Sequence, residues 1–150
     1  MLTITDDTST SAVMYPTWVT ANTGNLPTYT TSTKLSFNPS TGVLSSTSFL
    51  SSTAAGLTAD AGSAQGNGVI TSTYNIYSTV ATTGDAATLP ATFAVGTIIY
   101  IKNDGANSMD VFPASGDDAG AGADTAVAIA AGVGAAFIGT TADAVWTQLY

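Results

Sequence analysis

The chain consists of short runs rich in β-branched and aromatic residues, each bounded by Gly, Pro, Asn or Asp. Branching at Cβ restricts side-chain rotamers in a helix and suits a pleated strand. Helix signals are weak along the whole sequence. Many short strands separated by turn residues predict an all-β fold of the sandwich or barrel kind.

The side chains that most enzymes use are missing. The 150 residues include no His, Cys, Arg or Glu; the cations are Lys34 and Lys102, and the anions are ten Asp. A Ser or Thr nucleophile needs an adjacent base, and the two lysines fall in expected strands, where a surface charge is the simpler interpretation. The sequence therefore predicts a structural or adhesive protein with no catalytic residues, no cofactor and no metal site.

Charge and hydropathy exclude two classes of partner. The formal net charge of -8 repels phosphate backbones and anionic lipid, so we expect no nucleic acid and no membrane as partners. The N-terminus has no basic segment followed by an apolar one, which predicts no signal peptide. The most apolar window, Ala126 to Ile138, is shorter than the ~20 residues that span a bilayer.

Composition divides the chain into three segments. Residues 1–50 form a Thr- and Ser-rich β module, residues 51–67 a small-residue linker, and residues 68–150 a larger β domain. Instead of a flexible connector, the linker could be a segment wound tightly at a symmetry axis. Domains of about 60 residues are marginal alone, and without disulfides the remedy for the first segment is oligomerisation. We therefore expect a homo-oligomer.

The clearest local prediction is a hairpin in the first segment. Residues 34–37 alternate polar with apolar, Asn38 to Gly42 has the composition of a turn, and a strand returns from Val43 toward Phe49. Weaker strands are expected at 13–19, where Pro16 interrupts the run, and at 29–33.

The third segment carries about six expected strands and the better core. Tyr74, Ile76 and Val80 share one parity within the first strand. An Asp-Gly pair at 104–105 predicts a hairpin between the second and third strands, and a Gly-containing turn joins the fourth and fifth. An antiparallel sandwich or jelly-roll-like fold fits this pattern. The expected strands cover residues 69–82, 93–102, 109–112, 127–129, 135–138 and 145–150.

Carboxylates and aromatic rings are the remaining candidates for a site. The acidic clusters are Asp6 with Asp7, and Asp117 with Asp118 and Asp124. Solvated loop carboxylates are the simpler interpretation, and calcium binding at 117–124 is the alternative, although that loop lacks the ligand pattern of an EF-hand. Trp18, Trp146 and the six tyrosines could stack on sugars, but their spacing singles out no platform.

Two parts of the sequence resemble modules of tailed-bacteriophage virion proteins. The residues that carry the first resemblance are Leu2 to Thr10, Tyr15-Pro16 and Lys34 to Leu44. A second β-rich module, found on phage fibre and capsid-surface proteins, is similar to Gly96 to Asn107, Val111 to Ala114, Ala130 to Gly132, and Trp146. The resemblance implies a homotrimer on the virion surface, synthesised in the host cytoplasm. Neither module brings catalytic residues.

The resemblance and the size argument lead to one main hypothesis. It is a capsid decoration (cement) protein that binds the major capsid protein through residues 1–50 and stabilises the shell. The alternative is a short tail fibre or baseplate appendage that binds a host surface glycan. A polysaccharide hydrolase or lyase ranks last, because it needs two acidic groups in a groove.

Overall fold

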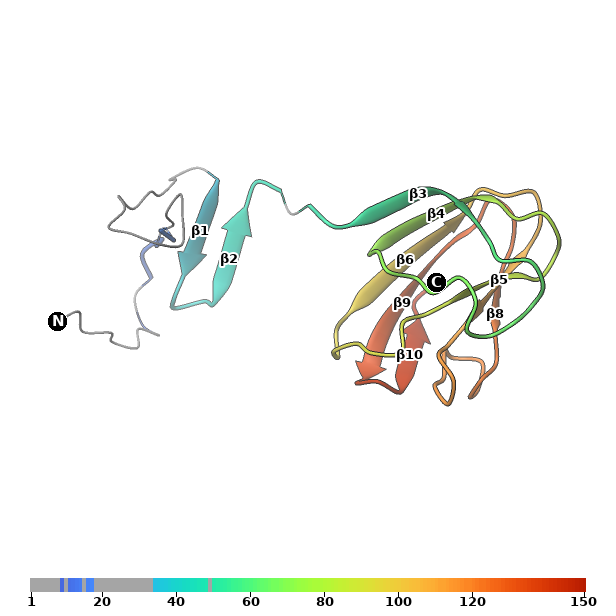
Figure 1. Ribbon diagram of the computed structural model, residues 1–150. Coiled ribbons are helices and arrows are strands. Elements are labelled where there is room, and N and C mark those ends of the chain that lie inside the picture. Colours follow the sequence, from blue (N-terminus) through green and yellow to red (C-terminus); the bar gives the residue numbers. More distant parts are fainter. Residues whose placement is uncertain (1–8, 10, 15, 18–33, 49) are drawn as a thin grey trace, which may run out of the picture. The chain divides into compact units, whose positions relative to one another are not determined.

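The computed structural model describes residues 9, 11–14, 16–17, 34–48 and 50–150. Every regular element in these residues is a strand, which confirms the all-β prediction (Figure 1). The chain divides into two compact units, Met1–Leu50 and Ser51–Tyr150. The expected strand at 29–33, most of the one at 13–19, and the candidate residues Asp6, Asp7 and Trp18 lie outside the described residues.

The first unit contains the predicted hairpin. Strand β1 (Leu35–Asn38) pairs antiparallel with β2 (Val43–Ser46), with Phe37 opposite Leu44. The Asn38 carboxamide oxygen accepts hydrogen bonds from the Ser40 backbone N–H at 3.1 Å and from its hydroxyl at 2.9 Å. Gly42 closes the turn at φ +67°, a conformation that favours glycine. The hairpin prediction is therefore confirmed.

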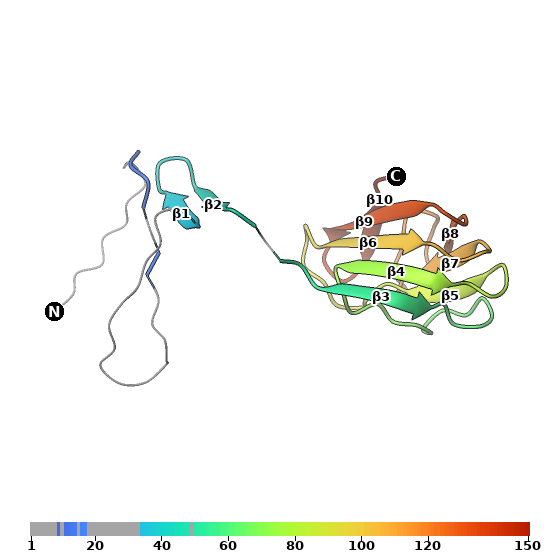
Figure 2. The same ribbon diagram turned by 90° about the horizontal axis from the view of Figure 1, so that it is seen from above.

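The second unit contains two sheets with one core between them. Figure 2 shows β3, β4, β6 and β9 side by side in one layer. The larger sheet has the order β10-β9-β6-β4-β3 and is formed by β3 (Thr53–Thr58), β4 (Tyr74–Thr79), β6 (Ile98–Asn103), β9 (Gly134–Thr141) and β10 (Val145–Gln148). The smaller sheet has the order β5-β7-β8 and is formed by β5 (Asp85–Thr88), β7 (Met109–Phe112) and β8 (Val127–Ile129).

The chain passes back and forth between the sheets instead of folding back within one. Strands β4, β5, β6 and β7 alternate between the two sheets, and the pairs β3–β4, β4–β6 and β5–β7 are parallel. Within the described strands of the second unit, only β6–β9, β9–β10 and β7–β8 are antiparallel. The antiparallel pairing expected for residues 68–150 is therefore wrong for β4–β6 and β5–β7, and the jelly-roll-like arrangement stays a prediction.

Both hairpins expected in this segment are corners between sheets. Strands β6 and β7 lie in different sheets, as do β8 and β9. At the first corner the Asn103 side chain accepts from the Gly105 N–H and donates to the carbonyls of Asn107 and Ile129, each at 2.9 Å. These hydrogen bonds direct the chain from one sheet to the other. The Asp-Gly pair alone does not predict that crossing. Gly105 is required there because a Cβ would lie 2.6 Å from the Val80 nitrogen.

The segment expected to be a linker is part of the second unit. Residues 53–58 form β3, which pairs in parallel with β4. Beyond it, Asp60 bridges to Ala86, so the chain also touches the smaller sheet. The sequence does not predict this pairing because β3 is an edge strand of small residues. Only its Leu57 packs against the core.

The core itself is a set of large side chains from both sheets. Phe93 and Trp146 pack with ring centroids 3.9 Å apart, and Trp146 is fully buried. The three residues that share one parity do not share one environment: Val80 is in the core, whereas Tyr74 and Ile76 face outward. On β4 the core-facing residues are Asn75 and Tyr77. Asn75 tolerates burial because its amide donates to the carbonyls of Ser72 and Tyr100. Other core residues are Val80, Leu89, Ile99, Ile101, Met109, Val111, Ile129 and Phe137.

Candidate functional site

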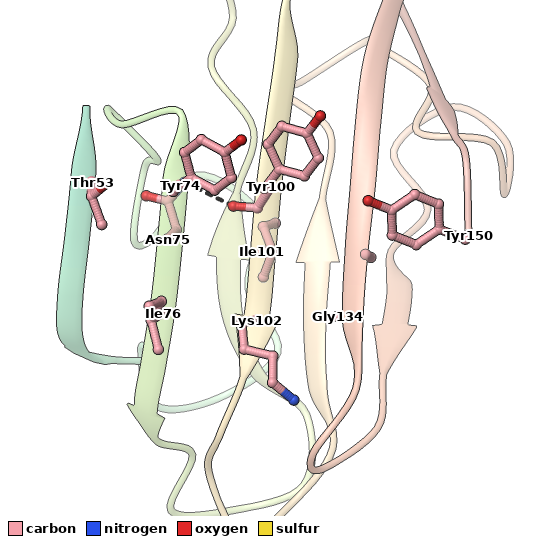
Figure 3. Close-up of a pocket in the computed structure, with 10 residues that line it drawn as sticks. Thr53, Tyr74, Asn75, Ile76, Tyr100, Ile101, Lys102, Gly134 and Tyr150 are labelled. Atoms are coloured by element: carbon pink, nitrogen blue, oxygen red, sulfur yellow. Dashed lines mark hydrogen bonds between the residues drawn. The ribbon is translucent and has the colours of Figure 1, made fainter. Parts of the chain in front are cut away.

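A hollow of about 500 Å³ lies on the outer face of the larger sheet (Figure 3). It is mostly apolar, and three tyrosines contribute to it. The remaining lining residues come from β3, β4, β6 and β9. The lining is Thr53, Tyr74, Asn75, Ile76, Tyr100, Ile101, Lys102, Gly134, Ala135 and Tyr150.

Strand alternation and parallel pairing place two of the tyrosines together. On β4 and β6, outward residues alternate with buried ones, so Tyr74 and Tyr100 both point away from the core. Their backbones are direct partners in the β4–β6 register. The rings stack with centroids 4.5 Å apart and planes 5° from parallel. Because the two rings stack on each other, their positions are set before any ligand binds, and together they present an aromatic surface.

Small residues on β9 make the floor beside this pair. Tyr100 lies opposite Ala136, and Lys102 lies opposite Gly134, so the next strand contributes no large outward side chain there. Tyr150, just beyond the end of β10, stands on the other side of β9, with its hydroxyl directed toward that strand (Figure 3). Tyr150 is 67% exposed. The hollow thus has tyrosines on two sides.

The charge at the hollow is already balanced within the protein. The Lys102 ammonium donates to the Gly132 carbonyl and lies 3.2 Å from the Asp104 carboxylate. Both side chains are substantially exposed, and such a surface pair contributes little to stability. Lys102 is the only Lys or Arg in residues 51–150, which contain eight aspartates. The formal net charge of this unit is therefore -7, from eight Asp and one Lys.

The acidic loop predicted as a possible calcium site uses its carboxylates internally. Asp118 accepts from the backbone N–H groups of Gly120 and Gly122, at 2.6 and 3.0 Å. Asp124 accepts from the Gly116 N–H at 2.7 Å and from the Gln65 amide at 3.0 Å, and these bonds lower its pKa. In the described part of the chain, no group of three or more acidic, His or Cys side chains could hold a metal ion.

Two buried groups have displaced pKa values without forming a catalytic pair. Burial raises the pKa of Asp117, and the nearby carboxylates of Asp143 and Asp124 raise it further. One Asp117 carboxylate oxygen is buried without a hydrogen-bond partner. Burial, assisted by the charge of Asp60, raises the pKa of Tyr77 to about 12. Neither Asp117 nor Tyr77 lines the hollow.

A second candidate surface is the hairpin of the first unit. Five apolar side chains on or next to it are between 38% and 52% exposed: Val13, Met14, Phe37, Val43 and Leu44. Met14 bridges to Phe37 through two backbone hydrogen bonds, so one side of the hairpin is covered. Within the described residues, β2 pairs with β1 alone. We call these five residues, which strand alternation distributes over both faces of the hairpin, the hairpin patch.

The sequence predicted residues 1–50 as a binding segment but singled out neither the five residues of the hairpin patch nor the hollow. Among the aromatic residues that could stack on sugars, Trp146 lies in the core, Trp18 is outside the described residues, and three of the six tyrosines line the hollow. Tyr74 and Tyr100 meet only because β4 and β6 are parallel neighbours, and no local signal gives that pairing. For the hairpin patch a signal existed: apolar residues in a segment too small to bury them.

Comparison with family models, with curated proteins and with solved structures gives no match. Among the described residues, no helix has the length and apolar character needed to cross a membrane. The case for a function therefore depends on the hollow, the hairpin patch and the composition of the chain.

Proposed function

We propose that the chain is a structural protein of a tailed-bacteriophage virion, a capsid decoration protein that binds the outer shell as a homotrimer. The observation that carries the proposal is the hairpin patch. Its apolar side chains, Phe37 and Leu44 among them, are 38% to 52% exposed on a two-stranded sheet. A lone hairpin is marginally stable in water and needs further strands or a packing surface.

Assembly would complete this unit. Full burial of an exposed large apolar side chain stabilises by roughly 1.5–3 kcal/mol. Because the residues of the hairpin patch are 38% to 52% exposed, covering each of them would contribute about half of that. Other copies of the chain and the major capsid protein are the proposed partners. No strand of the described residues pairs with the edge of β2 that faces away from β1, and an added strand from a partner would bind the backbone N–H and C=O groups there.

A trimer would bind a shell through several sites at once. Once one subunit is bound, the others bind at high effective concentration, so weak individual contacts give strong attachment. A protein that binds only the assembled lattice shifts the equilibrium toward it, and the shell becomes more resistant to disruption. No catalytic chemistry is needed, and the hollow is lined by no carboxylate that could act as an acid or base.

The test uses the full chain and shells made of the major capsid protein of the same virus. We expect the wild-type protein to bind these shells and to raise their disruption temperature. The double variant Phe37→Ser/Leu44→Ser should lose binding by at least tenfold, because it removes two members of the hairpin patch. Val95→Ser is the matched control, since Val95 is 64% exposed in the other unit. Absence of shell binding by the wild-type chain contradicts the proposal.

A second candidate function is a short tail fibre or baseplate appendage that binds a host surface glycan. The hollow with Tyr74, Tyr100 and Tyr150 favours it, because exposed aromatic rings suit sugar recognition. The number of copies in each virion separates the two: a decoration protein covers the shell, whereas an appendage is present in far fewer copies.

A further inference from the structure

We propose that the hollow on the outer face of the larger sheet is a binding site for a neutral saccharide, held between Tyr100 and Tyr150. This goes beyond shell binding and does not depend on it, because the hairpin patch and the hollow belong to different units. The site could act on a capsid or on a tail.

The arrangement of the strands sets the width of the site. One face of the Tyr100 ring is covered by Tyr74, whereas on its other side β9 carries the small residues Gly134 and Ala136. Neighbouring strands are about 4.8 Å apart, so β6 and β10, on either side of β9, are separated by roughly 9–10 Å. The uncovered face of the Tyr100 ring can contact a flat ring at about 3.5–4 Å. Tyr150, whose hydroxyl is directed toward β9, bounds the same space from the other side of that strand (Figure 3). One sugar ring stacked on Tyr100 would contact the edge of Tyr150.

The chemistry of the walls matches a sugar better than a wholly apolar ligand. The C–H face of a pyranose packs on aromatic rings, and its hydroxyl groups need donors and acceptors at the edge of the same site. The phenol groups of the tyrosines, the Thr53 hydroxyl and the Lys102 ammonium lie around the hollow (Figure 3). The volume of about 500 Å³ is within the range of small-molecule sites and leaves room for a short oligosaccharide.

Charge favours a neutral ligand over an anionic one. The Lys102 ammonium already has Asp104 as its charge partner, so an anionic ligand would compete with that carboxylate, whereas a neutral hydroxyl can use the remaining N–H of the ammonium. The eight aspartates of residues 51–150 repel anions at longer range. The same repulsion acts against a second copy of this acidic unit in the hollow. A neutral saccharide neither competes with Asp104 for the Lys102 ammonium nor is repelled by the negative charge of the unit.

The experiment uses the full chain, first on an array of neutral and acidic oligosaccharides and then in calorimetric titration with the best neutral glycan. Tyr150→Ala should weaken binding about fivefold to tenfold, since an aromatic contact contributes up to about a factor of ten. Gly134→Val should weaken it at least as much by filling the floor. A Cβ at Gly134 meets Ile101 O at 3.5 Å and Lys102 Cδ at 3.8 Å, which are ordinary contacts, so the sheet should remain intact.

The control variant is Val95→Ala, at an exposed position that does not line the hollow, and its affinity should equal that of the wild type. Melting curves show whether each variant is folded. The proposal is overturned if no neutral glycan binds, if only acidic glycans bind and Lys102→Met abolishes that binding, or if Tyr150→Ala alters self-association and leaves glycan binding unchanged. Shell binding, measured separately with the hairpin variants, can fail or succeed independently of these outcomes.

Discussion

The two units of this chain differ in how far their largest apolar side chains are buried. In residues 51–150, Phe137 and Trp146 are completely buried between two sheets. In the first unit, Phe37 and Leu44 are 38% and 50% exposed on a hairpin. A hydrophobic core stabilises a unit from within, whereas an exposed apolar hairpin gains stability only from something that covers it. The difference supports the proposal that the second unit is self-sufficient and that the first is completed by assembly.

The largest expected effect is on the core of the second unit. Trp146→Ala removes a fully buried ring that packs on Phe93, and should lower the free energy of unfolding by about 3–5 kcal/mol. Urea unfolding followed by circular dichroism measures the change. A loss below about 1 kcal/mol would show that this core is not what holds the unit together.

The second prediction concerns the exposed hairpin of the first unit. Phe37→Ser/Leu44→Ser should change the unfolding free energy of the second unit by less than about 0.5 kcal/mol, because surface substitutions rarely exceed that. The same variant should weaken trimer formation at least tenfold, equivalent to about 1.4 kcal/mol. Sedimentation velocity over a range of concentrations measures the association. If the variant assembles like the wild type, the hairpin patch is not the interface.

Two glycines of β9 provide a matched pair. At Gly139 a Cβ would lie 2.5 Å from the Phe93 ring, whereas at Gly134 it would make only ordinary contacts. Gly139→Ala should therefore destabilise by about 1–3 kcal/mol through overpacking. Gly134→Ala should be neutral or slightly stabilising, because alanine restricts the unfolded chain more than glycine does. Thermal unfolding of both variants distinguishes tight packing from a general cost of alanine in this strand.

The smallest expected effect is on the pH dependence of the second unit. Because the pKa of Asp117 is raised, its neutral form favours folding below the ordinary carboxyl range, and this contribution is lost as pH rises through the raised pKa. Asp117→Asn should then be more stable than the wild type at pH 7, with a gap that closes as the pH falls.

Asp124 is the control with the opposite sign. Its pKa is lowered, so its contribution is present above the ordinary carboxyl range and is lost as pH falls through the lowered pKa. Asp124→Asn should be less stable than the wild type at pH 7, and asparagine tolerates the positive φ of 58° at this position. Unfolding curves between pH 3 and 7 test both signs. Parallel curves for the two variants would contradict the assignment.

What could be predicted from the sequence was local. The turn from Asn38 to Gly42 follows from the side-chain bonds of one residue and the φ of another, so the hairpin was correctly predicted. The Asp-Gly pair at 104–105 looks like the same kind of signal. The structure at this pair, however, depends on the Asn103 side chain, which donates to the carbonyl of Ile129, 26 residues away. The chain therefore crosses to the other sheet and forms no hairpin here.

The candidate surfaces show the same limit. The stacked tyrosines depend on β4 and β6 being parallel partners, and the floor of the hollow depends on the register of β9 against β6. Such non-local pairings are decided by the whole core. By contrast, the expectation that the first unit needs a partner follows from its size and its low content of large apolar residues, because that argument requires no strand pairing; it stays a prediction.

The most direct test of the central claim follows the hairpin amides as the full chain associates. Hydrogen exchange of residues 34–48, measured from dilute to concentrated solution, reports whether assembly completes the first unit. The account predicts weak protection in the monomer, strong protection in the trimer, and a melting temperature that rises with concentration. A monomer at all concentrations, with a protected hairpin and an unchanging melting temperature, would contradict it.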